Sequence, residues 1–389
     1  MRFIHIADLH LGFRTYEREK NYNPFISLDF AVQYAIKHKV DLFVIAGDIF
    51  DRRDPPVFIQ RGFAHSIKKL LKNQINVFIL TGNHEGAPNP KRDIHLDLYN
   101  ELEIEGVTVA KKMDYFKVND LNIIAIPYPF KRNLLSKEEY KDKSENEIGV
   151  IMNQKIVRGI DKLLERIDRG LPTILVAHLP LLEGEVGEEK YIYFSTDTPL
   201  SIEDIDRKEF SYIAMGHFHK MQILSSKKFV HPVVYPGSLD RINFGEEKDK
   251  KGFFDVDISR ETKKPSFISI ENPFARKFYT IRVNNNEDIK NINWERAKQS
   301  IVRILLMQDL EDEKLFKKLL ERVKKEAMVF TGVVDKREIK NSAARSKLNL
   351  SISPEEAIDK YIKFQDNTFA KKYKEEILKT AISLLKGEE

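Results

Sequence analysis

The chain has 389 residues, of which 42% are hydrophobic and 32% are charged, and it contains no cysteine. These values exclude a disordered or fibrous protein, disulfides, thiolate metal sites and cysteine nucleophiles, so any metal must be held by His, Asp, Glu or Asn. The net charge of +5, from 65 basic and 60 acidic residues, permits nucleic-acid binding but does not by itself argue for it. The length corresponds to roughly two to three domains.

The first 240 residues contain short apolar runs rich in Val, Ile and aromatic residues, a composition that predicts buried strands. These runs are Phe3–Ala7, Leu42–Ala46, Val77–Leu80, Ile123–Ile126, Ile174–Ala177, Tyr212–Met215 and Val233–Tyr235. Apolar residues at three- and four-residue spacing predict helices at Ser27–His38, Phe58–Leu71 and Glu147–Arg169. This alternation predicts an α/β domain over residues 1–270, completed by a period-two strand segment at Gly252–Ile270.

The pattern changes after residue 270. Strands at Phe278–Val283 and Ala327–Val334, with helices at Trp294–Leu306 and Asp312–Lys325, predict a small α+β domain over residues 271–340. Residues 341–352 are polar and lack a clear period, which predicts a linker. A helix pair is expected over residues 353–389, because Ser353, Pro354 and Glu356 form a helix-start signal.

Features of membrane insertion and secretion are missing from the sequence. No apolar run approaches the roughly 18 to 20 residues that a membrane-spanning helix needs. The opening residues MRFIHIADLHLG lack the charged, apolar and cleavage segments of a signal peptide. We therefore expect a cytoplasmic protein.

Five of the predicted strands end in polar residues that are able to bind metal ions. Because ligands of open α/β sheets bind beyond the carboxyl ends of the strands, we expect these residues to converge in one crevice. Glycines precede Asp48, Asn83 and His217, where they allow tight turns and close backbone approach. The polar residues are Asp8, His10, Asp48, Asn83, His84, His178, His217 and His219.

These residue types suit Mn²⁺, Fe²⁺ or Zn²⁺. Two such ions about 3.5–4 Å apart can clamp a phosphate and generate hydroxide between them. Such a pair needs a bridging carboxylate, and Asp48 is the natural candidate. A lone His is more often a satisfied core residue, but the ordered set with a strand before each member is far more specific.

The ordered motifs D-x-H, G-D, G-N-H-E, H and G-H-x-H resemble those of the calcineurin-like metallophosphoesterase superfamily. The segments IHIADLHLG at the start, AGDIFDRRDPP at 46–56 and YPGSLDRINFGEE at 235–247 resemble the SbcD nucleases, prokaryotic relatives of the meiotic-recombination-eleven family. The motif match covers about residues 1–255. The resemblance implies a four-layer α/β/β/α sandwich with a small α+β cap domain and a C-terminal helical tail.

The resemblance also implies a site for two Mn²⁺, with other divalent ions possible, and a metal-bound hydroxide as nucleophile. His84 would lie near the scissile phosphate without binding metal, and it would stabilise the transition state or protonate the leaving oxygen. Asp51 occupies a position where some relatives carry a second His that helps to position DNA, so that role does not transfer. One ion would be held by Asp8, His10, Asp48 and His219, and the other by Asp48, Asn83, His178 and His217.

The resemblance implies DNA ends, a homodimer partner and an ATPase as binding partners. The homodimer would form through helices near residues 28–38 and 57–72. The C-terminal helices would dock in a groove of an SMC-like ATPase of the SbcC or Rad-fifty type, in preference to packing on their own domain. The contact residues would be Ile358, Tyr361, Ile362, Phe369, Tyr373 and Ile377.

Basic residues near the motifs are candidates for contacts with DNA phosphates, although a solvated surface is the simpler explanation for any one of them. They are Arg52, Arg53, Lys91, Arg92, Lys131, Arg132 and Arg241.

The function implied is Mn²⁺-dependent DNA double-strand-break repair, with 3′-to-5′ exonuclease activity on duplex ends and endonuclease activity on single strands or hairpins, in a nucleoid-associated protein. Two alternatives remain open. Another phosphoesterase of the superfamily, a phosphatase or a cyclic-nucleotide phosphodiesterase, would use the same ligands. A mainly non-catalytic DNA-end tether and ATPase scaffold is the second, although the complete ligand set argues against lost catalysis.

Overall fold

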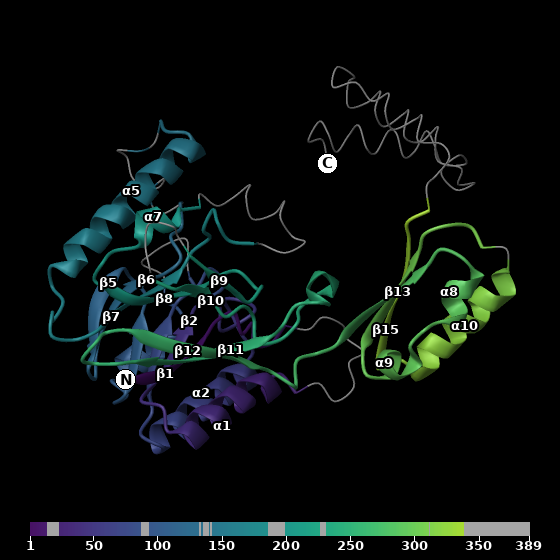
Figure 1. Cartoon of the computed structure of the whole chain (residues 1–389), viewed down its shortest axis with the longest axis horizontal. Helices are drawn as coiled ribbons and strands as arrows, with labels where there is room; N and C mark the ends of the chain where they lie inside the picture. Colours follow the sequence, from purple (N-terminus) through teal and green to yellow (C-terminus); the bar gives the residue numbers. More distant parts are fainter. Residues whose placement is uncertain are drawn as a thin grey trace, which may run out of the picture. The chain divides into compact units, whose positions relative to one another are not determined.

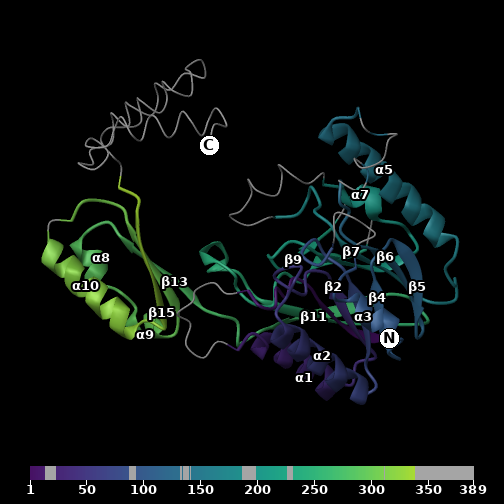
Figure 2. The same cartoon turned by 180° about the vertical axis from the view of Figure 1, so that it is seen from behind.

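The computed structural model describes residues 1–13, 23–86, 93–131, 134, 140, 142–185, 199–225, 231–310 and 312–337 (Figures 1 and 2). The chain forms two compact units. Within the described residues, the larger comprises Met1–Thr280, Asn293–Arg303 and Glu321–Thr331, and the smaller comprises Ile281–Ile292, Ile304–Leu320 and residues 332–337. The domain boundaries predicted from the sequence, at 270/271 and around 341–352, stay predictions. Among the described residues, no helix has the length and apolar character needed to span a bilayer.

The first sheet of the larger unit has six strands in the order β12-β11-β1-β2-β3-β4. Strands β1 to β4 run parallel, and the β11–β12 hairpin joins β1 in antiparallel fashion. The helices that cover this sheet are α1 (Ile26–His38) and α2 (Val57–Lys72). The strands are β1 (Arg2–Ile6), β2 (Leu42–Ala46), β3 (Asn76–Leu80), β4 (Val107–Ala110), β11 (Gly252–Ile258) and β12 (Pro265–Glu271).

The second sheet also has six strands, in the order β5-β6-β7-β8-β10-β9. Its four central strands are parallel, and β5 and β9 pair antiparallel at the two edges. Helix α5 (Glu145–Leu164) covers it and begins at a capping box between Ser144 and Glu147. The strands are β5 (Asp114–Val118), β6 (Leu121–Ile126), β7 (Thr173–His178), β8 (Phe210–Gly216), β9 (Gln222–Leu224) and β10 (Val233–Tyr235).

Alternate side chains of the central strands belong to different cores. In β2, Val44 packs between the two sheets, whereas Phe43 and Ile45 pack against α1 and α2. In β7, Val176 faces the first sheet and Leu175 packs against α5. A strand buried on both faces needs no polar alternation, which explains the continuous apolar runs of the sequence. Both views show α1 and α2 on one side of the paired sheets and α5 on the other (Figures 1 and 2).

A third, small sheet has the order β13-β14-β15. The Ile301 N–H donates to the Lys277 carbonyl and the Met307 N–H donates to the Val283 carbonyl, so β13 and β14 run parallel. The short helices are α3 (Asp97–Glu101), α7 (Ile202–Ile205), η3 (Phe244–Glu246), α8 (Asn286–Lys290) and α9 (Trp294–Lys298). The remaining elements are β13 (Phe278–Val283), β14 (Ile301–Leu306), α10 (Glu313–Glu326) and β15 (Val329–Asp335).

One predicted helix is wrong beyond its first turns. Trp294–Leu306 is helical only over Trp294–Lys298, and Ile301–Leu306 is strand β14. The reason is the fully buried Ile301, Val302 and Ile304, whose β-branched side chains favour a strand. The other predicted strands and helices within the described residues are confirmed, with Gly252–Ile270 divided into a hairpin and the helix from Glu147 ending at Leu164. The mixed α/β class is confirmed as well.

Candidate metal centre

The carboxyl ends of β1, β2 and β3 in the first sheet lie beside those of β7 and β8 in the second. Side chains from these ends form three groups, and within each group the potential ligand atoms lie within 4.8 Å of one another. Asp8, Asp48 and His178 are fully buried, and Asp48 belongs to two of the groups. The groups are Asp8, His10 and His219; His10, Asp48 and His84; and Asp8, Asp48 and His178.

Asn83 and His217 join the same cluster. The Asn83 Oδ1 atom lies 3.1 Å from His178 Nε2 and 3.2 Å from His217 Nδ1. All seven predicted metal ligands and His84 therefore lie in one place, as the strand-end pattern predicted; their role as ligands stays a prediction. We define these eight residues as the strand-end cluster.

The backbone at the strand-end cluster is strained. Asp8, His10, Asp48 and His217 have φ values of 52°, 42°, 51° and 101°. Such left-handed conformations cost on the order of 1–3 kcal/mol each in residues other than glycine. They turn the chain sharply where each strand ends, so that the side chains of neighbouring strands face one another.

Two glycines let the sheets approach closely enough to form the cluster. Gly47 has a φ of 96°, and a Cβ atom on it would lie 2.1 Å from His178 Nδ1. A Cβ atom on Gly216 would lie 1.9 Å from the Ala46 carbonyl oxygen. Neither position has room for a side chain, which gives the Gly-Asp and Gly-His pairs of the sequence a physical cause.

Hydrogen bonds to the protein fix three imidazole rings. The Nδ1 atom of His178 lies 2.7 Å from the Ala46 carbonyl, and that of His84 lies 2.6 Å from the Asp51 carbonyl. The Nδ1 atom of His219 lies 3.1 Å from Glu246 Oε1. Because only a protonated nitrogen can donate to these acceptors, the Nε2 atoms of the neutral rings carry lone pairs.

These Nε2 atoms face other potential ligand atoms. His219 Nε2 is 3.0 Å from His10 Nε2, and His178 Nε2 lies 3.4 Å from Asp48 Oδ2. Acceptor atoms this close repel one another unless a cation or a proton lies between them. Imidazole, carboxylate and amide oxygen are the ligands that divalent Mn, Fe and Zn bind, so the residues fit divalent cations. Asp48 also lies 3.8 Å from His10 Nε2, which gives it access to both halves of the cluster.

The charges in the cluster favour a positive ion. Burial lowers the pKa of His178, but the carboxylates of Asp48 and Asp8 outweigh it and raise the pKa to about 9. Burial raises the pKa of Asp48, yet His178 and His10 hold it well below its ordinary value. The site therefore stabilises both a carboxylate and a cation beside it.

Main-chain N–H groups orient the two carboxylates. The His217 N–H donates to Asp8 at 3.0 Å, and the His84 N–H donates to Asp48 Oδ1 at 3.0 Å. Glu85, whose pKa is raised to about 7 by burial and by Asp48, accepts from the Phe50 and Gly82 N–H groups at 2.7 and 3.0 Å. Glu85 thereby joins the loops after β2 and β3.

Three residues near the cluster had no role in the sequence prediction. Glu85 closes the G-N-H-E motif, and Glu246 ends the segment YPGSLDRINFGE, so both motifs contained the signal without revealing the contact. Tyr128 stands on the loop after β6, with its ring centre 5.6 Å from that of His217. Nothing in its sequence surroundings marks Tyr128.

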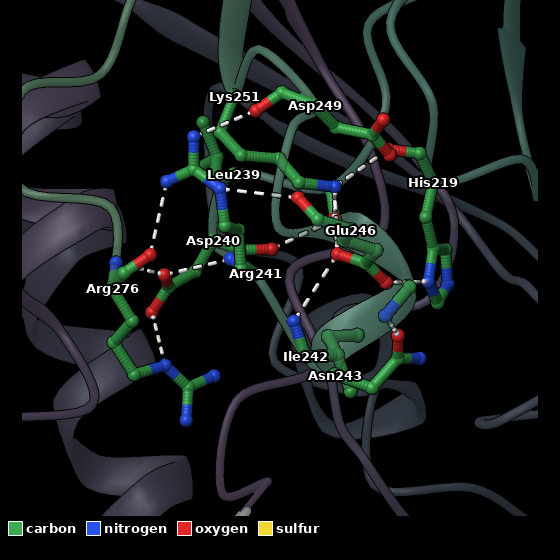
Figure 3. Close-up of polar contacts among 12 residues, drawn as sticks. His219, Leu239, Asp240, Arg241, Ile242, Asn243, Glu246, Asp249, Lys251 and Arg276 are labelled. Atoms are coloured by element: carbon green, nitrogen blue, oxygen red, sulfur yellow. Dashed lines mark hydrogen bonds and ion pairs between the residues drawn. The ribbon is translucent and has the colours of Figure 1, made fainter. Parts of the chain in front are cut away.

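Four of the basic residues proposed to bind DNA lie in the described part of the chain, and none of these four belongs to the strand-end cluster. Arg52 is exposed, Lys131 is half-buried, and Arg53 Nε donates to the Gly86 carbonyl at 3.1 Å. The Arg241 guanidinium donates to three main-chain carbonyls, at 2.6, 2.9 and 3.2 Å (Figure 3). Contacts with DNA by these four stay predictions. The predicted DNA residues Lys91, Arg92 and Arg132 lie outside the described residues, as do the tail residues Ile358, Tyr361, Ile362, Phe369, Tyr373 and Ile377.

Comparison with known proteins identifies a matching family model and several similar proteins. The family model described as calcineurin-like phosphoesterase matches residues 1–221. The DNA double-strand break repair protein Mre11 of Methanocaldococcus jannaschii is 30% identical over 315 residues, which is 78% of this chain and 75% of that protein. The SbcD component of the nuclease SbcCD from Escherichia coli K12 is 25% identical over 254 residues, 63% of this chain and 62% of that protein. A dimetal phosphatase structure from Danio rerio aligns with a TM-score of 0.42 at 11% identity, over 69% of this chain and 98% of that one.

Proposed function

The chain belongs to the calcineurin-like phosphoesterase family, among the relatives of Mre11 and SbcD, and from this premise we propose that it is a metal-dependent DNA nuclease of double-strand-break repair. The activities would be 3′-to-5′ exonuclease on duplex ends and endonuclease on single strands or hairpins. The observation that carries the proposal is the convergence of imidazole groups on the buried Asp48 carboxylate, whose Oδ2 atom lies 3.8 Å from His10 Nε2 and 3.4 Å from His178 Nε2. A nuclease that uses two cations needs such a shared carboxylate.

The strand-end cluster would hold two Mn²⁺ or other divalent ions. When bound, the ions would supply Lewis-acid polarisation of the phosphodiester and activation of a water molecule. The protein's own part is to fix the ligands through main-chain hydrogen bonds to Asp8, Asp48 and His178. One ion would be held by Asp8, His10, Asp48 and His219, and the other by Asp48, Asn83, His178 and His217.

His84 would act on the substrate without binding metal. Its side chain is 35% exposed, whereas Asp48 beside it is 3% exposed, so His84 can reach a phosphodiester that lies outside the cluster. The Asp51 carbonyl fixes the ring by accepting from Nδ1, which leaves Nε2 to hold or release a proton at the leaving oxygen. This contact uses the main chain of residue 51, so Asp51 in place of a second His is compatible with the role.

The larger assembly completes the proposal. The four-layer α/β/β/α order would carry the site, residues 271–340 would form a DNA-orienting cap, and α1 and α2 would form the homodimer interface. The tail at 353–389 would bind an SMC-like ATPase of the SbcC or Rad-fifty type. Support comes from the Escherichia coli relative, whose name describes one component of a larger nuclease.

The test is release of nucleotides from linear duplex DNA by the purified chain, with Mn²⁺ varied and EDTA as the blank. The proposal predicts Mn²⁺-dependent release that falls by about 10²- to 10⁴-fold in His84→Ala, the range that one general acid contributes. His95→Ala is the matched control, since His95 is also 35% exposed but pairs with Asp54 outside the cluster. Hydrolysis of small phosphoesters without DNA cleavage would identify a different phosphoesterase, and binding of DNA ends without turnover would identify a scaffold.

A further inference from the structure

A buried ion pair, Lys251 and Glu246, contacts His219 (Figure 3). Lys251 precedes β11, Glu246 lies in η3, and their charged groups are 2.7 Å apart. The Lys251 side chain is 0% exposed and that of Glu246 is 9% exposed. A lysine this deeply buried is rare and costs desolvation free energy, so its contacts call for an explanation.

Lys251 uses all three of its N–H donors. Besides Glu246, its Nζ atom donates to the Ser238 hydroxyl at 2.8 Å and to the His219 carbonyl at 2.9 Å. The ammonium group therefore joins the main chain at His219 to the side chain of Glu246. Because all three donors are used, moving the ammonium group away from any one of these partners would break a buried hydrogen bond.

Glu246 divides its two oxygens between different tasks. Oε2 accepts from Lys251 and from the Ile242 N–H at 3.1 Å, which anchors the carboxylate. Oε1 faces His219 Nδ1 at 3.1 Å. Since a carboxylate is only an acceptor, this contact requires a proton on His219 Nδ1, which in the neutral ring leaves the lone pair on Nε2. That lone pair points to His10 Nε2, 3.0 Å away.

We propose that Glu246 and Lys251 are positioning residues for His219, which fix its tautomer and ring orientation so that Nε2 is presented to the cation held with Asp8 and His10. The inference rests on the proposed function for the identity of the ligand. It goes beyond that function because neither residue belongs to the predicted ligand set. Positioning partners of this kind typically change metal affinity by about 10- to 100-fold when they are removed.

The loop that carries Glu246 is held by contacts of its own. The Glu246 side chain can therefore be substituted while these contacts keep the loop in place. Asp240 and Arg276 form an ion pair at 2.8 Å, and Arg241 donates to the Glu246 and Asp249 carbonyls (Figure 3). These contacts involve no side chain of the strand-end cluster. Glu246→Gln should therefore keep the loop in place while it removes the acceptor-only group, and Asp240→Asn is a control that perturbs the same loop without contacting His219.

The experiment measures Mn²⁺ binding to the full chain by calorimetry, together with ¹⁵N spectra of the histidine rings in the metal-free protein. We expect Glu246→Gln to weaken one of two Mn²⁺ sites by about 10- to 100-fold and to leave the other unchanged. Asp240→Asn should bind both ions normally. The spectra should show His219 as the Nδ1–H tautomer in the wild type and a change of that tautomer in Glu246→Gln.

The outcomes separate the inference from the proposed function. A wild-type chain that binds no Mn²⁺ overturns the proposed function, and the ring spectra then still test the role of Glu246. Two normal Mn²⁺ sites in Glu246→Gln, or an Nε2–H tautomer of His219 in the wild type, overturn the positioning role. The double variant Lys251→Met/Glu246→Gln removes both charges together. It should lose as much Mn²⁺ affinity as Glu246→Gln alone.

Discussion

The core between the two sheets and the strand-end cluster both bury histidines, but in opposite electrostatic surroundings. His5 in the middle of β1 has its Nδ1 atom 3.0 Å from the Tyr212 hydroxyl, and burial lowers its pKa to about 3. His178 at the end of β7 is as deeply buried, yet Asp48 and Asp8 raise its pKa to about 9. Burial alone therefore does not distinguish the candidate metal centre from the core; the carboxylates that surround its buried histidine do.

The two regions should also respond differently to substitution. The core side chains pack between the two sheets, on strands with ordinary backbone conformations. Their contacts stabilise the fold. The cluster residues hold strained backbone and closely spaced charges, a combination that natural proteins keep where function requires it. Changes in the core should thus reduce stability with little effect on activity, and changes in the cluster should do the reverse.

The largest effect is expected for Asp48→Asn. The substitution removes the carboxylate that contacts both His10 and His178, so neither cation would have its shared ligand. We expect no measurable nuclease activity and the loss of tight Mn²⁺ binding, by DNA cleavage assay and calorimetry. Asp206→Asn is the matched control, because Asp206 is a buried acid paired with His231 outside the cluster. Unchanged Mn²⁺ affinity in Asp48→Asn would contradict the account, because the strand-end cluster would then differ from the core in no property related to metal binding.

The next largest effect is expected in the free energy of unfolding, which His5 makes dependent on pH. Its pKa is about 3 in the folded chain and has the ordinary value of 6.5 when unfolded, so the unfolded state takes up the proton first. The stability from neutral His5 is complete above pH 6.5 and is lost as the pH falls toward 3. Between pH 7.5 and pH 5 this amounts to about 2 kcal/mol.

Chemical unfolding in EDTA at those two pH values tests this prediction. His5→Gln removes the titrating ring but keeps a polar partner for Tyr212, so the acid-induced loss of stability should be smaller in the variant. An equal loss in both proteins would mean that His5 is not held neutral by the core.

The smallest effect is expected for Tyr212→Phe. The substitution deletes the hydroxyl that contacts His5 and leaves the ring packed between the sheets, so it should cost about 1 kcal/mol of unfolding free energy. Mn²⁺ affinity and nuclease activity should be unchanged. A large loss of activity would show that the core and the cluster are coupled, contrary to the comparison.

The sequence reveals the strand-end cluster because apolar runs and the polar residues after them are local features. Parallel strands bring their carboxyl ends to one edge of a sheet, so Asp8 and Asp48 meet at the edge of the first sheet without further information. His178 ends a strand of the second sheet, and it joins them because the two sheets stack with these edges together. The predicted helix is wrong at Ile301–Leu306 because helical and strand spacing are hard to distinguish in a short, mostly apolar run. The β-branched side chains and the burial of this segment favour a strand.

Contacts made by single side chains across the fold were not predictable. The Glu246–Lys251 pair depends on where η3 and the start of β11 meet the loop after β8, which no local pattern records. Arg241 has the charge expected of a phosphate contact, but three main-chain carbonyls accept its N–H groups. Charge and position in the sequence do not distinguish a surface arginine from one engaged in this way.

The most direct measurement of the central claim is anomalous diffraction at the manganese edge from crystals of the full chain grown with Mn²⁺. The account predicts two peaks, one among Asp8, His10 and His219 and one among Asn83, His178 and His217, with Asp48 within coordination distance of both. A single peak, or manganese bound only outside these residues, would contradict it.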